Sequence, residues 1–200
     1  MREYQSIGYF KPKYNGRSIV AFYKYDGSNI RVEYRKNKGF VKFGSRTKLI
    51  DETHTQFGEA VRMFRSEYQH QLQAIIDSNK KLSTAKELVF FFEYYGDKSF
   101  AGKHVEGDTM HLVLIDMWNK KPVDPEEFIE LFFNKVPIAG IVYRGILDDE
   151  FIKYVKSDTQ QFAEGVVCKG RNLVFKLKTD AWLNRCKSEL GDARYKEELR

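Results

Sequence analysis

Short runs of β-branched and aromatic residues, most of them bounded by Gly, Asp or Asn, recur along the chain and limit its fold more than any other feature. The runs are Ser18–Tyr25, Asn29–Tyr34, Gly39–Phe43, Glu87–Tyr94, His111–Met117, Gly140–Tyr143, Glu164–Cys168 and Leu173–Lys178. Between the first two runs, the dipeptide Asp26-Gly27 predicts a tight turn and, taken alone, a β-hairpin. The chain is therefore predicted to be rich in strands.

Two segments have the pattern of helices that would cover the sheets. Between positions 57 and 76, apolar residues recur at steps of three and four. A second helix is predicted in VDPEEFIELFF, where Asp124 can cap the helix and Pro125 suits its first position. The tail 180–200 carries many charges and few large apolar residues, which predicts a solvated helix or a frayed end. The expected fold class is α+β, with antiparallel sheets and flanking helices.

Composition and charge favour a globular protein with a polyanionic partner. Of the 200 residues, 42% are hydrophobic and 15% aromatic, which suffices for a sizeable core, and the net charge is +6. Eight Lys and Arg residues but only two acidic residues lie between Lys24 and Lys48. No apolar run approaches the roughly 18 residues that span a bilayer. The N-terminal residues lack the apolar core of a signal peptide, and Cys168 and Cys186 lack zinc-ligand spacing, so we expect a cytoplasmic protein without membrane contact.

Two motif-like patterns are rejected. GDKSFAGK, residues 96–103, resembles a phosphate-binding loop, but five residues separate its glycines and His104 replaces the Ser or Thr that such a loop requires. The four histidines lack the spacing of a zinc site. Cys168 is expected to be a small core residue.

Five charged residues lie in strongly apolar strand contexts. In AFYKYDGSNIRVEY, residues 21–34, alternation along the strand puts Ile19, Ala21 and Tyr23 on one face and Lys24 on the other. The other four charged residues are Glu93, Glu164, Lys176 and Lys178. Charged side chains are seldom buried without a partner, so five in one small protein are hard to explain as separate strand ends.

Lys176 and Lys178 lie two residues apart on one strand and therefore point to the same face. Two ammonium groups on one face repel each other, and an anion between them would make this arrangement tolerable. The pair therefore predicts an anion on that face of the strand.

The charged positions belong to motifs that follow one another in a specific order. The motifs are Lys24-Tyr25-Asp26-Gly27, Ser45-Arg46, Phe92-Glu93-Tyr94, Glu164-Gly165-Val166-Val167 and Lys176-Leu177-Lys178. This order resembles the covalent nucleotidyltransferase superfamily of polynucleotide ligases and capping enzymes. The resemblance extends from Ser18 to Lys178 and implies a nucleotidyltransferase fold, an ATP-grasp-like ligase adenylation domain with antiparallel sheets.

The resemblance implies that Lys24 attacks the α-phosphate of ATP, displaces pyrophosphate and becomes lysyl–AMP. Its amine must first lose a proton, and cationic Lys176 and Lys178 together with desolvation would disfavour the ammonium form, whose pKa in free lysine is about 10.4. The two lysines would also hold the phosphates. Glu93 would accept hydrogen bonds from the ribose, and Glu164 would position a divalent metal, Mg²⁺ or Mn²⁺.

Four further residues are assigned to the nucleotide site by the same resemblance. Arg46 resembles an arginine that contacts the nucleotide and the incoming 5′-phosphate, and Tyr23 belongs to the nucleotide-binding set. Asn29, in Lys-x-Asp-Gly-x-Asn, resembles the asparagine of RNA ligases of the phage RNA ligase 2 and RNA-editing type. Ile115, in HLVLIDMW, stands where the family usually has an aromatic residue, and an aliphatic side chain can also pack on a purine.

These features predict a single adenylation domain, residues 1–200, that acts as a monomer. Only residues 179–200 follow Lys178, too few for an appended OB-fold domain. The expected substrates are RNA ends, either free or in a nicked duplex. Their 5′-phosphate and 3′-hydroxyl would be joined through lysyl–AMP and AMP-capped intermediates.

Other functions remain open at this level. The chain could be a DNA ligase core, a GTP-using capping enzyme, or a basic RNA-binding module with a vestigial nucleotide pocket. The set of intact motifs argues against the binding module, which has no need of Lys24 beside Glu164.

Overall fold

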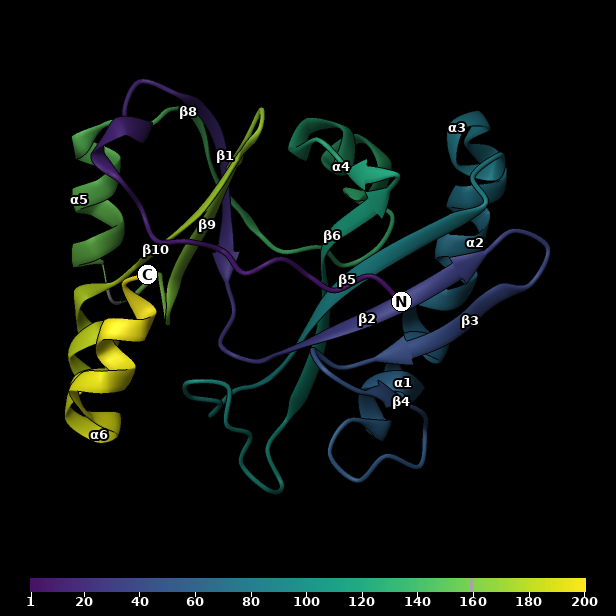
Figure 1. Cartoon of the computed structure of the whole chain (residues 1–200), viewed down its shortest axis with the longest axis horizontal. Coiled ribbons are helices and arrows are strands. Elements are labelled where there is room, and N and C mark those ends of the chain that lie inside the picture. The colour runs from purple at the N-terminus through teal and green to yellow at the C-terminus, as the bar shows by residue number, and fades with distance from the viewer. Residues whose placement is uncertain (159) are drawn as a thin grey trace. The chain divides into compact units, whose positions relative to one another are not determined.

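The computed structural model describes residues 1–158 and 160–200, and they divide into two compact units (Figure 1). Unit 1 consists of Met1–Gln5 and Gly27–Ile138, and unit 2 of Ser6–Asp26 and Ala139–Arg200. Each unit contains one antiparallel sheet with flanking helices, so the predicted α+β class is confirmed. Within the described part of the chain, no helix has the length and apolar character needed to cross a membrane.

Unit 1 is built on a six-stranded sheet with the order β4-β3-β2-β5-β6-β7. The strands are β2 Ser28–Arg35, β3 Gly39–Gly44, β4 Leu49–Ile50, β5 Glu87–Gly96, β6 Met110–Asn119 and β7 Lys121–Pro122. The helical segments are α1 Gly58–Met63, the π-helical turn η2 Phe64–Tyr68, α2 Gln69–Ser78, α3 Lys80–Ser83 and α4 Pro125–Phe132. The predicted helix between positions 57 and 76 is therefore present, with a π-helical turn in its middle. Asp124 caps α4 as predicted, because its carboxylate accepts a hydrogen bond from the Glu126 amide at 3.0 Å.

Aromatic side chains hold the unit 1 sheet to its helices. The rings of Phe64 and Tyr68 meet the Phe92 ring edge-on, with centroids 5.6 and 4.9 Å away. Because side chains alternate along a strand, the neighbours of Phe92 on β5 point to the opposite face. On that face, Tyr4 packs against Phe91 with the ring centroids 4.8 Å apart. Glu93 shares this second face of the sheet with Phe91.

Unit 2 is built on a four-stranded sheet with the order β10-β9-β1-β8. Its elements are the short 3₁₀ helix η1 Pro12–Tyr14, the strands β1 Ser18–Lys24, β8 Ile141–Ile146, β9 Gly165–Gly170 and β10 Leu173–Lys178, and the helices α5 Asp149–Ser157 and α6 Asp180–Glu198. Residues of one sheet face form a core with α5, namely Ile19, Ala21, Val166, Cys168, Leu173, Phe175 and Leu177 with Phe151, Ile152 and Val155. The predicted alternation of β1 is thus confirmed, and Cys168 is a core residue. Lys24, Lys176 and Lys178 are at the alternate positions, on the other face.

The predicted hairpin around Asp26-Gly27 is wrong. Strand β1 pairs with β8 and β9, whereas β2 pairs with β3 and β5, so the two strands belong to different sheets. The chain passes from unit 2 to unit 1 at this dipeptide. Turn chemistry is a local property, and the pairing partner of a strand is decided by contacts that are distant in sequence.

Candidate active site

The pairing register of unit 2 places two of the predicted lysines on either side of one glycine. Gly165, the first residue of β9, pairs with Lys24 of β1 on one side and with Lys178 of β10 on the other. Gly165 has φ of +148°, and a Cβ atom there would lie only 2.2 Å from the Leu177 carbonyl oxygen. A glycine is therefore required at the point where the lysine-bearing strands meet.

Glu164, directly before this glycine, joins the two lysines. Its Oε1 lies 2.9 Å from Lys24 Nζ and 2.5 Å from Lys178 Nζ. Glu164 is buried, with 3% of its surface exposed, and in the described part of the chain its Oε2 has no hydrogen-bond partner. A buried carboxylate is stable only when it is paired, so the two ammonium groups hold one of its oxygens while the other is available to a ligand.

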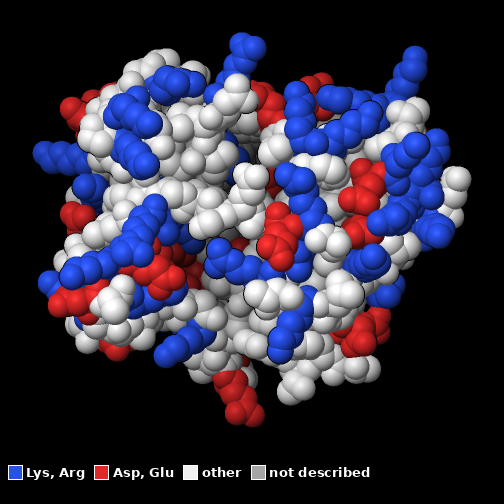
Figure 2. Space-filling view, in the orientation of Figure 1, with Lys and Arg blue, Asp and Glu red and all other residues white. Residues whose placement is uncertain are grey.

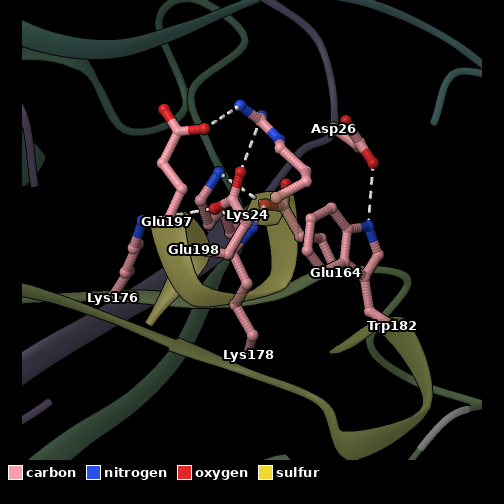
Figure 3. Close-up of polar contacts among 9 residues, drawn as sticks. Lys24, Asp26, Glu164, Lys176, Lys178, Trp182, Glu197 and Glu198 are labelled. Atoms are coloured by element: carbon pink, nitrogen blue, oxygen red, sulfur yellow. Dashed lines mark hydrogen bonds and ion pairs between the residues drawn. The ribbon is translucent and has the colours of Figure 1, made fainter. Parts of the chain in front are cut away.

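The anion predicted between Lys176 and Lys178 is a carboxylate of the protein itself. Glu198, in the last turn of α6, places its Oε2 2.8 Å from Lys178 Nζ and 3.3 Å from Lys176 Nζ. Its Oε1 lies 2.7 Å from Arg194. Figure 3 shows Lys176 and Lys178 of β10 and Glu198 of α6 converging near Lys24 of β1. Together with Lys24 and Glu164 they form one charged cluster on the sheet face opposite the core.

The cluster changes the proton affinity of its members. Burial lowers the pKa of Lys176, and although Glu198 acts in the opposite direction, the positive charges of Lys178 and Lys24 lower it further. For Glu198, burial acts to raise the pKa, but the hydrogen bond and charge of Lys178, with the charges of Lys176 and Arg194, lower it to about 2. Glu198 is therefore an anion throughout the physiological range.

The low pKa of Glu198 predicts an acid-dependent contribution to stability. A carboxylate with a lowered pKa stabilises the folded state at pH values above its unfolded-state pKa of about 4.3 and loses that contribution as the pH falls toward the folded-state value. Glu198→Gln should therefore reduce the free energy of unfolding at pH 7 by an amount on the order of 3 kcal/mol. The reduction should shrink as the pH is lowered from 5 toward 2, as measured by urea unfolding.

Glu189→Gln is the matched control for that measurement. Glu189 lies on the same helix and pairs with Arg185 at 2.7 Å, but its side chain is 49% exposed. An exposed pair of this kind contributes little to stability, so the control should resemble the wild type at every pH. A reduction by Glu198→Gln that does not depend on pH would contradict the pairing described above.

Trp182 connects the nucleophile motif to α6. Its ring centroid lies 3.4 Å from Lys178 Nζ, and its Nε1 donates a hydrogen bond of 2.8 Å to the Asp26 carboxylate. The sequence prediction assigned no role to Trp182, Arg194 or Glu198. The predicted solvated or frayed tail is only partly right: it is helical, but Trp182 and Glu198 are buried. A mostly charged segment gives no sign of which carboxylate is buried, so only the three-dimensional contact reveals Glu198.

The side chains of Tyr23 and Lys24 lie on opposite faces of the unit 2 sheet. The Tyr23 ring packs against Phe162 with centroids 5.7 Å apart, and its hydroxyl accepts a hydrogen bond from Gln161 Nε2 at 3.2 Å. The structure thus brings Lys24, Glu164, Lys176 and Lys178 together, whereas the Tyr23 side chain belongs to the core face.

Two predicted residues of unit 1 face each other across paired strands. Asn29 of β2 is directly opposite Glu93 of β5. The Asn29 side-chain amide donates a hydrogen bond of 3.2 Å to the Phe92 carbonyl oxygen. Its Oδ1 is buried and, among the residues that the structure describes, finds no hydrogen-bond donor. An unpaired buried oxygen is energetically costly, so this atom is a natural acceptor for a ligand hydroxyl or a water molecule.

The other two predicted residues of unit 1 lie at irregular positions. Ile115 is the extra residue of a bulge in β6, since the pairing passes from Asp116 opposite Phe91 to Leu114 opposite Phe92. Arg46 is exposed in the turn between β3 and β4.

Part of the basic segment after the nucleophile is structural. Arg31 is buried and donates hydrogen bonds to the carbonyl oxygens of Ser45 at 2.8 Å and Arg2 at 3.1 Å. Burial lowers its pKa. Arg35 pairs with Glu33 at 2.7 Å. The exposed Lys42 lies 4.0 Å from the same carboxylate. The other exposed cations of this segment are Lys36, Lys38, Arg46 and Lys48.

Comparisons with known proteins agree with the motifs and the fold. The sequence profile of the RNA ligase family matches residues 17–183. Among solved structures, a mutant of Naegleria gruberi RNA ligase with AMP and Mn is 17% identical, with a TM-score of 0.68 over 94% of this chain and 59% of that chain. The same ligase with PPi is 18% identical, with a TM-score of 0.65 over 88% and 54% of the two chains. A mutant with ATP and Mn is 17% identical, with a TM-score of 0.67 over 92% and 58%.

At this level of identity, the structural matches support a shared fold only. In each match, this chain spans less than three-fifths of the length of the Naegleria ligase. No curated protein matches the sequence. The profile match is of a different kind, since it covers most of the chain and includes each of the motifs from Lys24 to Lys178. The resemblance to covalent nucleotidyltransferases is therefore confirmed, and the chain belongs to the RNA ligase family.

Proposed function

We propose that this chain is the adenylation domain of an ATP-dependent RNA ligase, with both units as parts of that one domain. The observation that carries the proposal is the placement of Lys24 and Lys178 around one buried carboxylate, Glu164, with Lys176 on the same sheet face. An amine beside lysines that can hold phosphate and a carboxylate that can hold a metal has the composition that nucleotidyl transfer to lysine needs.

In the first step, the neutral amine of Lys24 attacks the α-phosphorus of ATP. The new phosphorus–nitrogen bond forms as the bond to the bridging oxygen of the β-phosphate breaks, pyrophosphate leaves, and the amine nitrogen gives up a proton. The Glu164 carboxylate at 2.9 Å favours the ammonium form of Lys24, whereas a divalent cation on that carboxylate, together with the positive charges of Lys176 and Lys178, would favour the neutral amine. The two lysines would also attract the phosphates. The Lys24 side chain is also 23% exposed, so part of its surface is open to a ligand.

Glu164 suits a divalent cation. Its Oε2 is buried and lacks a hydrogen-bond partner within the described residues, and a carboxylate oxygen is the ligand type that Mg²⁺ and Mn²⁺ prefer. No group of three or more His, Cys, Asp or Glu side chains that could hold a metal is found among the described residues. Mg²⁺ commonly binds through one or two carboxylates together with substrate phosphates and water. Such a cation, when bound, would neutralise phosphate charge and compete with Lys24 for the Glu164 carboxylate.

In the second and third steps, the activated AMP passes to RNA. A 5′-phosphate oxygen attacks the phosphorus of lysyl–AMP, the phosphorus–nitrogen bond breaks, and Lys24 recovers a proton. The 3′-hydroxyl of the other end then attacks the 5′-phosphorus, loses its proton, and displaces AMP. Similar structures that contain AMP, PPi, or ATP with Mn belong to the Naegleria RNA ligase, which supports these ligands for the present chain.

Unit 1 contains the residues that the family resemblance assigns to the nucleoside and the incoming end. Glu93 and Asn29, opposite each other on β5 and β2, offer oxygen acceptors for hydroxyl groups. Ile115 is proposed to pack on the base and Arg46 to contact phosphate. Figure 2 shows Lys and Arg side chains gathered over the end of unit 1 that carries the β2–β3 turn, where Lys36 and Lys38 are exposed. Such cations suit a phosphate backbone.

Sealing of matched nicked duplexes tests the choice of polynucleotide. The duplexes differ only in whether the strand with the 3′-hydroxyl ends in ribonucleotides or deoxyribonucleotides, and a single-stranded RNA is run beside them. We expect sealing of the ribonucleotide end, with AMP-capped RNA as an intermediate. The Lys24→Ala chain serves as the blank. Equal or better sealing of the deoxyribonucleotide end would assign the chain to DNA ligation instead.

A further inference from the structure

We propose that the Glu198 carboxylate occupies, in the ligand-free chain, the place beside Lys176 and Lys178 that a phosphate group takes, and that phosphate binding releases residues 192–200 of α6. The inference rests on the proposed function for the identity of the ligand, a nucleoside triphosphate or the pyrophosphate that it yields. It adds Glu198 as an internal competitor, which Arg194 contacts from within the same segment.

The Glu198 carboxylate makes the contacts that a phosphate group would make. One oxygen contacts two ammonium groups, from Lys178 at 2.8 Å and Lys176 at 3.3 Å, and the other contacts the Arg194 guanidinium at 2.7 Å. Carboxylate and phosphate oxygens accept charge-assisted hydrogen bonds from the same lysine and arginine donors. The site therefore binds an anion already, and the anion is supplied by the chain.

Glu198 differs from Glu164 in how it is anchored. Glu164 directly precedes β9 and is continuous with the sheet, so it stays in place when a ligand arrives. Glu198 belongs to a short segment after Gly191, whose φ of +85° and ψ of 172° interrupt α6. A glycine with non-helical dihedrals is a natural hinge, because it adopts positive φ without a steric penalty.

Few contacts oppose the movement of this segment. Among residues 191–200, Glu198 is the one buried residue. Beyond its ion pairs, the segment end is held by a hydrogen bond of 2.8 Å from the Tyr9 amide to the Arg200 carbonyl oxygen. Apart from Glu198, Arg194 and Tyr195 are half-buried and the other residues of the segment are exposed. Release therefore uncovers part of one aromatic ring and costs mainly the ion pairs of Glu198 with Lys176 and Lys178. A phosphate ligand replaces those ion pairs with its own, and it carries more negative charge than one carboxylate.

Isothermal titration with inorganic pyrophosphate tests the competition. Glu198→Gln keeps the size of the side chain but removes the competing charge, so it should bind pyrophosphate about 10-fold more tightly than the wild type, within the usual range of coupling between sites. Glu189→Gln, which alters an ion pair on the same helix that does not touch the lysines, should bind like the wild type. Equal or weaker binding by Glu198→Gln, or no binding by any chain, would overturn the inference.

A second measurement uses the wild-type chain and does not depend on a variant that folds. Amide hydrogen exchange of residues 192–200 should become faster when pyrophosphate is added, because the segment leaves its position. Unchanged or slower exchange in this segment, at pyrophosphate concentrations that saturate the chain, would overturn the inference.

The competition between Glu198 and phosphate can fail independently of the proposed ligase function. If ATP labels Lys24 but pyrophosphate leaves Glu198 in place, the competition is wrong and the proposed ligase function stands. If pyrophosphate releases the segment and Lys24 is never labelled, the anion site is real and its phosphate ligand does not serve adenylation.

Discussion

Lys24→Ala should abolish covalent labelling of the chain by α-labelled ATP in the presence of Mg²⁺ or Mn²⁺. Lys24 is the lysine of the nucleophile motif, its Nζ lies 2.9 Å from Glu164, and its side chain is partly exposed, unlike that of Lys178. If this amine is the nucleophile, the substitution removes the nitrogen atom that bonds to AMP. The loss should therefore be complete, as measured by denaturing electrophoresis.

Two controls keep this result interpretable. Lys153→Ala removes an exposed lysine of α5, on the core side of the unit 2 sheet, and should label like the wild type. Lys24→Ala should remain folded, since Glu164 keeps its contact with Lys178. Label that persists in Lys24→Ala would place the nucleophile elsewhere. Label from α-labelled GTP alone would assign the chain to capping chemistry.

Glu164→Gln should slow adenylation by a factor on the order of 10² or more, with the chain still folded. Glutamine keeps the shape of the side chain but removes the negative charge that contacts Lys24 and Lys178 and that would hold a divalent cation. Preorganised charges of this kind commonly contribute two to three powers of ten to a rate. The rate of label formation should be measured across a titration of Mn²⁺ and Mg²⁺.

Glu189→Gln, on the exposed side of α6, is again the control and should label at the wild-type rate. If Glu164→Gln also labels at that rate at every metal concentration, Glu164 has only a structural role and the proposed metal site is wrong.

The face of the unit 2 sheet on which each side chain lies could be predicted, because it follows from the local alternation of residues along a strand. Strand alternation alone separates Lys24 from Ile19 and Ala21, and the two-residue spacing places Lys176 and Lys178 on one face with an anion between them. The structure confirms which faces these residues occupy, and the anion that it shows beside the two lysines is the Glu198 carboxylate. The phosphates that the family resemblance assigns to them stay a prediction. The roles of Glu93, Asn29, Arg46 and Ile115 rest on the family resemblance and stay predictions.

The failures share one physical cause, which is dependence on contacts distant in sequence. The chain bends at Asp26-Gly27, yet β1 and β2 find partners in different sheets. Arg31 lies in a basic segment, but its side chain is buried and donates hydrogen bonds to backbone carbonyl oxygens. Glu198 lies in a charged tail, and only the approach of α6 to β10 reveals it as the anion between the lysines.

Peptide mass spectrometry of the wild-type chain after incubation with ATP and Mn²⁺ tests the central proposal most directly. The peptide that contains Lys24 should gain the mass of one AMP, on the lysine side chain, and the modification should be lost on addition of pyrophosphate as ATP re-forms. An AMP adduct on Lys176 or Lys178, or no adduct on any peptide, would contradict the assignment of Lys24 as the nucleophile.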